Sequence, residues 1–222
     1  MRYLYHHELS PASRTVRIVL AEKGVPFGLR VEETWRRNEA FLALNPAGEV
    51  PVLLEPDGFP VCGGWAICEY LEELYPSPGL LGADPRARAE VRRLVEWFDT
   101  KFFREVTEPV VREKIFSRMY GSGSPDSREI RAANANLREH LKYIRHLYDR
   151  RSWLAGDVMT LADLAAAAHL SLVDYAGDVP WSEFRETKEW YAILKSRPSF
   201  RPLLEASIPA VRPPPHYADL DF

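Results

Sequence analysis

Every strand signal in this chain of 222 residues falls before Cys62. Four apolar runs of strand length are separated by a helical pattern that ends at Gly24 and by a turn at Pro56-Asp57-Gly58. This order predicts a β-α-β unit, then a β-hairpin, then a further helix. The predicted strands lie at 2–5, 25–31, 50–54 and 59–61, and the predicted helices at 13–23 and 65–74.

A proline-rich segment ends this region, because Pro76 and Pro78 disfavour helix at the residue before each of them. Beyond it the periodicity is helical throughout. We expect a long helix from Pro85 to about Phe116, interrupted near Pro109, where a proline removes a backbone donor and kinks the helix.

A later helix is predicted to be wholly buried. Thr160 and Asp163 form a variant capping box, and the helix body at 164–173 is apolar on all sides. The chain as a whole is predicted to be α/β plus all-α. We expect a thioredoxin-like domain at 1–76, an all-helical domain at 85–207 and a proline-rich tail at 208–222.

The composition narrows the possible functions. A hydrophobic content of 46% suits a globular core, and a net charge of -3 argues against general nucleic-acid binding, which needs a basic excess. No signal peptide and no apolar stretch near the roughly 18 residues of a membrane span are found, which favours a cytoplasmic protein without membrane insertion. Cys62 and Cys68 have neither zinc-site nor CxxC spacing, so no metal is expected and Cys68 is assigned to the core.

Four motifs in register carry a family resemblance. They are Ser10 to Gly24 (SPASRTVRIVLAEKG), Asn45 to Leu53 (NPAGEVPVL), Ala66 to Leu71 (AICEYL) and Gly156 to Asp163 (GDVMTLAD). Together they resemble the glutathione transferase superfamily over about residues 1 to 205. The resemblance implies the glutathione transferase fold, with a thioredoxin-like N-terminal domain and an α-helical C-terminal domain.

The resemblance also implies a glutathione pocket. Serine-type members place a hydroxyl at the start of the first helix, where N–H groups stabilise the glutathione thiolate, and the candidates here are Ser10 and Ser13. An alternative for Ser10 is a helix N-cap followed by Pro11. The peptide Val50-Pro51 is expected to be cis and to present backbone groups to an extended ligand.

Gly63 and Gly64 depart from the family pattern. Members usually carry an acidic or amide residue followed by serine at these two positions, which grip the γ-glutamyl end of glutathione. Losing one charge-assisted hydrogen bond costs about 1.5 to 3 kcal/mol, so the pocket is expected to be degenerate. The backbone N–H of Gly64 remains available to a carboxylate.

The glycine pair and the tail together resemble the glutathione-transferase-like, FtsZ-binding cell-division proteins of alphaproteobacteria. This resemblance implies a non-catalytic cytoplasmic homodimer that binds FtsZ filaments at the division site and promotes constriction. The dimer is expected to form along the helix from Pro85, with contacts from Glu90, Arg92, Arg93 and Trp97.

Two segments are predicted to contact the partner. Trp35, Arg36 and Arg37 have the composition of an interface anchor; the alternative for Trp35 is a tryptophan packed under its loop. In the tail, three prolines hold the chain extended, and the predicted contacts are Tyr217, Asp219, Leu220 and Phe222. The alternative is that the tail folds back and covers the helical core.

Other functions stay open. The runner-up is a glutathione S-transferase acting on a small electrophile through Ser10 or Ser13, with glutathione as its cosubstrate. A redox enzyme would need a cysteine where Ala12 stands. His6 and His7 are read as surface or loop residues. The basic positions between Arg131 and Arg151 are a solvated helix face or a docking surface for an acidic partner.

Overall fold

A computed structural model describes residues 1–121, 124–209 and 211–220. The chain divides into two compact units, Met1–Leu80 and Leu81–Phe222. The N-terminal unit is a mixed four-stranded sheet with three α-helices, and the C-terminal unit is helical, apart from two isolated β-bridges among its described residues. This division into an α/β part and a helical part confirms the predicted fold class.

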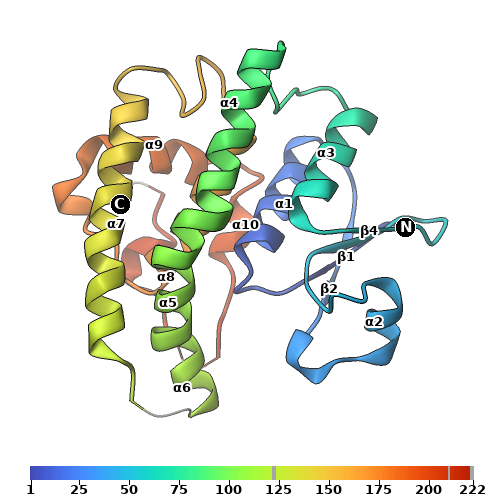
Figure 1. The fold of residues 1–222 in the computed structure, drawn as a ribbon, viewed down its shortest axis with the longest axis horizontal. Helices are drawn as coiled ribbons and strands as arrows, with labels where there is room; N and C mark the ends of the chain where they lie inside the picture. The colour runs from blue at the N-terminus through green and yellow to red at the C-terminus, as the bar shows by residue number, and fades with distance from the viewer. Residues whose placement is uncertain (122–123, 210, 221–222) are drawn as a thin grey trace. The chain divides into compact units, whose positions relative to one another are not determined.

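The sheet of the N-terminal unit, in which Figure 1 labels β1, β2 and β4, has the strand order β2-β1-β3-β4. β1 pairs in parallel with β2, and the hairpin strands β3 and β4 are antiparallel, as predicted. Gly58, at φ +90° in the hairpin turn, occupies a backbone region that glycine tolerates best. The strands span Tyr3–His6 (β1), Gly28–Val31 (β2), Val52–Leu54 (β3) and Pro60–Cys62 (β4).

The helices α1 (Pro11–Glu22) and α3 (Gly64–Leu74) pack against each other. Their apolar positions join the sheet residues in one core, in which Leu4, Ile18 and Ile67 are wholly buried. The short helix α2 (Glu39–Leu44) contacts the sheet through Phe41, whose ring centroid lies 5.6 Å from that of Tyr5. A 3-10 turn, η1 (Thr34–Arg36), connects β2 to α2.

The long helix predicted from Pro85 continues past Pro109 without a break. It runs as alternating α-helical and π-helical stretches, and Pro109 is the second residue of the α-helical stretch that follows the first π-helical one. The wider turns of a π-helix alter the backbone ladder at the place where the proline ring would press on a preceding carbonyl, so the expected interruption was wrong. The stretches are α4 (Pro85–Glu96), η2 (Trp97–Thr107), α5 (Glu108–Val110), η3 (Val111–Phe116) and α6 (Ser117–Tyr120).

The remaining helices complete the C-terminal unit around α8 (Leu161–Tyr175), which is buried along its whole length as predicted. Asp163 closes the capping box with Thr160 and also accepts a hydrogen bond from the Trp190 indole at 3.1 Å. This carboxylate therefore fixes both the start of α8 and a neighbouring helix. The other elements are α7 (Ser127–Tyr148), η4 (Trp181–Glu183), α9 (Arg185–Lys195), α10 (Arg201–Leu204) and η5 (Pro215–Tyr217).

Candidate functional site

The two serines at the start of α1 have structural partners. Ser10 is the N-cap, and its hydroxyl oxygen accepts the backbone N–H of Ser13 at 3.2 Å, with Pro11 in the first helical position. This is the capping role weighed as the alternative for Ser10. Ser13 is wholly buried, and its hydroxyl accepts from the backbone N–H of His7 at 3.5 Å. Of the two candidates, only Ser10 is partly exposed.

The start of α3 lies directly against the start of α1. A Cβ atom at Gly64 would lie 3.0 Å from the Cβ of Ala12, which is closer than side-chain carbons normally approach. Gly63 has φ +93°, a conformation that other residues rarely adopt, and donates its N–H to the carbonyl of Pro51 at 3.0 Å. The peptide Val50-Pro51 is cis, as expected.

These contacts bring together Ser10, Ala12, Pro51, Gly63 and Gly64 without a side chain at either glycine. The backbone of Gly63 is already committed to Pro51, and the space beside Gly64 is filled by Ala12. A serine at position 64, as in the family pattern, would therefore press its Cβ against Ala12. The glycines are recognisable in the sequence, but the contact of Gly64 with Ala12 is not, since it depends on how closely two helices approach.

The segment after β2 lies at the surface, where Trp35 contacts His7 in the loop between β1 and α1. Trp35 is 46% exposed, and its ring meets the His7 imidazole edge-on at a centroid distance of 5.3 Å. Arg36 forms an ion pair with Glu33, whereas Arg37, in the left-handed region at φ 48°, is exposed. Trp35 is thus partly packed and partly available, which combines both interpretations of this residue.

His6 corrects another expectation. It is the last residue of β1 and only 1% exposed, so it is neither a surface nor a loop residue. Burial, followed by the positive charge of Arg17, lowers the pKa of His6 to about 4. The imidazole is therefore neutral at physiological pH, and its Nδ1 atom has no hydrogen-bond partner among the described residues.

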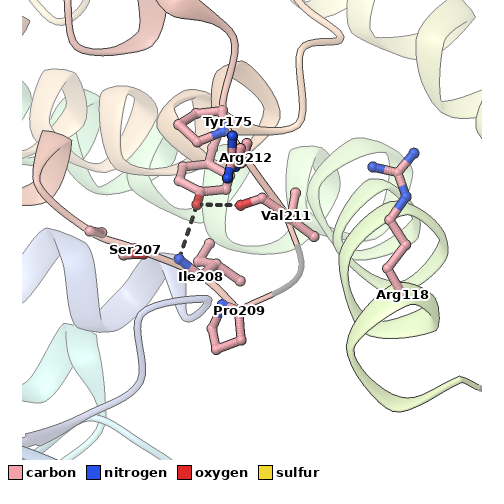
Figure 2. Close-up of a pocket in the computed structure, with 9 residues that line it drawn as sticks. Arg118, Tyr175, Ser207, Ile208, Pro209, Val211 and Arg212 are labelled. Atoms are coloured by element: carbon pink, nitrogen blue, oxygen red, sulfur yellow. Dashed lines mark hydrogen bonds between the residues drawn. The ribbon is translucent and has the colours of Figure 1, made fainter.

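The tail folds back onto the C-terminal unit. The Tyr175 hydroxyl donates to the carbonyl of Val211 at 2.9 Å and accepts the N–H of Ile208 at 3.0 Å, so one hydroxyl bridges two positions of the tail (Figure 2). Ile208, Pro209 and Val211 line one side of a cavity of about 740 Å³. Figure 2 shows Arg118 across the cavity, on the other wall, and Arg212 beside Tyr175.

Tyr217 corrects the prediction of a partner contact. Its side chain is 0% exposed, packs edge-on against Tyr175 at 5.0 Å, and donates its hydroxyl to the carbonyl of Leu203 at 3.1 Å. A ring with these contacts fastens the tail and is not available to another protein. Asp219 is exposed and Leu220 is half-buried, while Phe222 lies outside the described residues.

A buried polar group supports this arrangement. The carboxylate of Asp174 accepts the Trp181 indole N–H at 2.8 Å and pairs with the His216 imidazole at 2.9 Å, and the Lys195 amine donates to the carbonyl of His216 at 2.7 Å. Burial raises the pKa of Asp174 and lowers that of Lys195 to about 8. Neither Asp174 nor Lys195 was singled out from sequence, because a single charged residue in a helix gives no periodic signal.

The residues expected at a dimer contact also have partners within the chain. The Glu90 carboxylate binds the guanidinium groups of Arg93 at 2.8 Å and Arg151 at 2.7 Å, which lowers its pKa to about 2. The Trp97 indole donates to the Nδ1 atom of His140 at 3.1 Å. Most of the basic face on α7 is likewise neutralised by acids, through the pairs Arg138–Glu183, Lys142–Glu139 and Arg145–Asp149. This pairing favours a solvated helix face.

No group of three histidines, cysteines or acids in the described part of the chain is placed to hold a metal ion. None of the helices in the described ranges is both long and apolar enough to cross a membrane.

The thioredoxin-like sheet with its cis-proline, the capped first helix and the helical second unit define a glutathione-transferase-type protein. Comparison with known families agrees: residues 9–74 match the glutathione S-transferase N-terminal domain and residues 109–198 match the glutathione S-transferase C-terminal domain. The chain therefore belongs to the glutathione S-transferase family.

Within that family, FtsZ-localized protein A of Caulobacter vibrioides is 48% identical over all of this chain and 98% of that protein. The solved structure of FzlA from C. crescentus superposes with a TM-score of 0.96, covering 100% of this chain and 99% of that one. A structure described as a glutathione S-transferase from Rhodospirillum rubrum F11 is 65% identical, with a TM-score of 0.98 and full coverage of both chains.

Proposed function

We propose that this protein is a non-catalytic member of the glutathione S-transferase family that binds FtsZ filaments at the cytoplasmic division site and regulates constriction. The observation that carries the proposal is the 48% identity, along the whole chain, to a protein named FtsZ-localized protein A. Since identity covers both units and the tail, the whole chain resembles that relative, rather than one shared domain.

The geometry at the start of α3 supports the absence of catalysis. The positions that grip the γ-glutamyl group in family members are Gly63 and Gly64, and neither offers a side chain. Ser10 uses its hydroxyl to cap α1, and Ser13 is buried. Glutathione at this site would therefore lack both of its usual binding side chains, and the Ser10 hydroxyl, whose oxygen caps α1, would have only its proton to donate to the thiolate.

We further propose a symmetric homodimer. A dimer carries two copies of one filament contact, so modest single-site affinities multiply when both engage neighbouring subunits. Sedimentation at micromolar concentration should give a species of twice the 25.5 kDa chain mass. A single species at the chain mass would contradict the dimer.

Co-sedimentation with FtsZ filaments tests the filament contact. The full chain should pellet with FtsZ assembled in GTP and remain in the supernatant with unassembled FtsZ in GDP. Pelleting in neither condition would contradict the proposal. Binding to both forms equally would show that the contact does not require filaments.

The alternative is a glutathione S-transferase, favoured by the description of the 65% identical structure from Rhodospirillum rubrum F11. Calorimetry with glutathione separates the two functions. We expect no binding at millimolar glutathione, whereas a micromolar dissociation constant, or conjugation of a chlorinated aromatic substrate that Ser10→Ala abolishes, would establish the transferase.

Substitution at Gly64 tests why the pocket is degenerate. Gly64→Ser places a Cβ against Ala12 and should destabilise the protein by about 1–3 kcal/mol without restoring glutathione binding. The double variant Ala12→Gly with Gly64→Ser removes the clash and should recover most of that stability. Urea denaturation measures both effects, and a Gly64→Ser variant as stable as the wild type would show that the helices separate easily.

A further inference from the structure

The outer edge of β2 has backbone groups that no other strand uses. Among the described residues, β2 is the end strand of the sheet and pairs only with β1. Gly28 and Glu32 donate their N–H groups to carbonyl oxygens at positions 2 and 6, at 3.0 and 2.9 Å. Because successive backbone amides in a strand point to opposite sides, the N–H and C=O groups of Leu29 and Val31 point away from the sheet.

The side chains of these two residues are also exposed. Leu29 is 45% and Val31 63% exposed, and both lie on one face because they are two positions apart. Proteins usually protect such an edge with a proline, a bulge or a covering segment. β2 contains no proline, and its pairing with β1 runs residue for residue from Tyr3 with Gly28 to His6 with Val31, without a bulge. The edge is therefore open to pairing.

The positive charge at this edge is not neutralised. The Arg30 guanidinium lies 4.0 Å from the centroid of the Tyr3 ring and donates to the Tyr5 hydroxyl at 2.8 Å. Both partners are uncharged phenols, so Arg30 is held in place and keeps its full charge. In the described part of the chain, neither Arg30 nor the exposed Arg37 forms an ion pair with a carboxylate.

We propose that the outer edge of β2 binds an extended acidic segment of another protein as an additional strand. The backbone groups of Leu29 and Val31 supply the hydrogen bonds, their side chains contact apolar residues of the added strand, and Arg30 selects an acidic residue beside it. A second copy of β2 is a poor occupant, because a symmetric pairing centred on Arg30 places two like charges together. We treat this strand edge as a separate contact, in addition to the filament binding proposed above.

A short peptide of alternating glutamate and valine, with blocked ends, tests the proposal without FtsZ. The peptide should slow amide hydrogen exchange at Leu29 and Val31, while the matched lysine and valine peptide should not. Leu29→Pro removes one outward N–H that plays no part in pairing with β1, and should weaken binding roughly tenfold. Leu29→Thr shortens the same side chain but keeps that N–H, so it should bind within about threefold of the wild type.

Arg30→Glu provides a variant that leaves the strand backbone unchanged. It should weaken binding of the glutamate peptide by at least about tenfold and allow the lysine peptide to bind. Equal binding of both peptides to the wild type, no protection of Leu29 and Val31, or unchanged binding by Arg30→Glu would each overturn the proposal. Self-association of the wild type that Leu29→Pro abolishes would overturn it too, because the occupant would then be a second copy. Filament binding can fail or succeed independently of all these results.

Discussion

The segment 34–37 in the N-terminal unit and the tail residues 213–220 in the C-terminal unit each place an aromatic ring among charged and turn-forming residues. Trp35 is 46% exposed, while Tyr217 is not exposed at all. The difference lies in what surrounds each ring. Tyr217 meets another ring and a carbonyl acceptor at Leu203 and is wholly enclosed, whereas Trp35 meets the His7 imidazole edge-on and remains nearly half exposed.

This comparison shows that composition alone does not distinguish an anchor for a partner from an anchor for the chain itself. Three prolines lower the entropy lost when the tail is ordered, and this helps docking onto its own unit as much as docking onto another protein. The deciding feature is a place where the phenol hydroxyl finds an acceptor, since a buried hydroxyl without one is costly.

The largest expected effect is at Tyr217. Tyr217→Ala removes a fully buried ring and should lower the free energy of unfolding by about 3–5 kcal/mol. Tyr217→Phe keeps the ring and loses only the hydrogen bond to Leu203, so about 1 kcal/mol is expected. Urea denaturation checks both. If Tyr217→Ala costs less than about 1 kcal/mol but abolishes FtsZ binding, the ring is a partner anchor and the comparison fails.

Much of the fold was predictable from sequence. The β-α-β unit, the hairpin at Asp57-Gly58 and the capped helix after Thr160 each depend on local patterns, which the sequence displays directly. The continuous helix through Pro109 was not predicted, because the π-helical stretch before it has no distinct sequence pattern.

The candidate site was only partly predictable. The cis peptide at Pro51 followed from the family motif, and so did the loss of side chains at Gly63 and Gly64. The contact between Gly64 and Ala12 was not foreseen, since it joins residues far apart in the chain. Such contacts depend on packing distances of a few tenths of an ångström, which no residue pattern encodes.

The second prediction concerns the buried amine that holds the tail. The pKa of Lys195 is about 8 in the folded chain, below its ordinary value of 10.5. The unfolded chain therefore binds more protons between these two values, and stability from this group rises as the pH rises from about 8 to 10.5. The attraction of Asp174 and Asp219 for the charged amine is already contained in the value of about 8, and at about 1.4 kcal/mol per pKa unit the effect is expected to reach at most roughly 3 kcal/mol.

Lys195→Met removes the titrating group. Urea denaturation at a series of pH values should show that the wild type gains stability relative to this variant between pH 8 and 10.5. Parallel pH profiles for the two proteins would mean that the amine is not buried in solution. Asp174 and Lys195 would then hold His216 of the tail less firmly than their hydrogen bonds to it indicate.

The smallest effect on stability is expected at Trp35, and it tests the exposed side of the comparison. Trp35→Ala should lower the free energy of unfolding by about 1 kcal/mol or less, because nearly half of the residue is exposed. A central aromatic anchor can nevertheless contribute about 2 kcal/mol or more to an interface, so co-sedimentation with FtsZ filaments should weaken at least tenfold.

Phe59→Ala is the matched control, since Phe59 is another exposed aromatic of the same unit but precedes β4, at the opposite edge of the sheet. Loss of filament binding in both variants would point to a general effect of surface aromatics, and unchanged binding in Trp35→Ala would remove Trp35 from the filament contact.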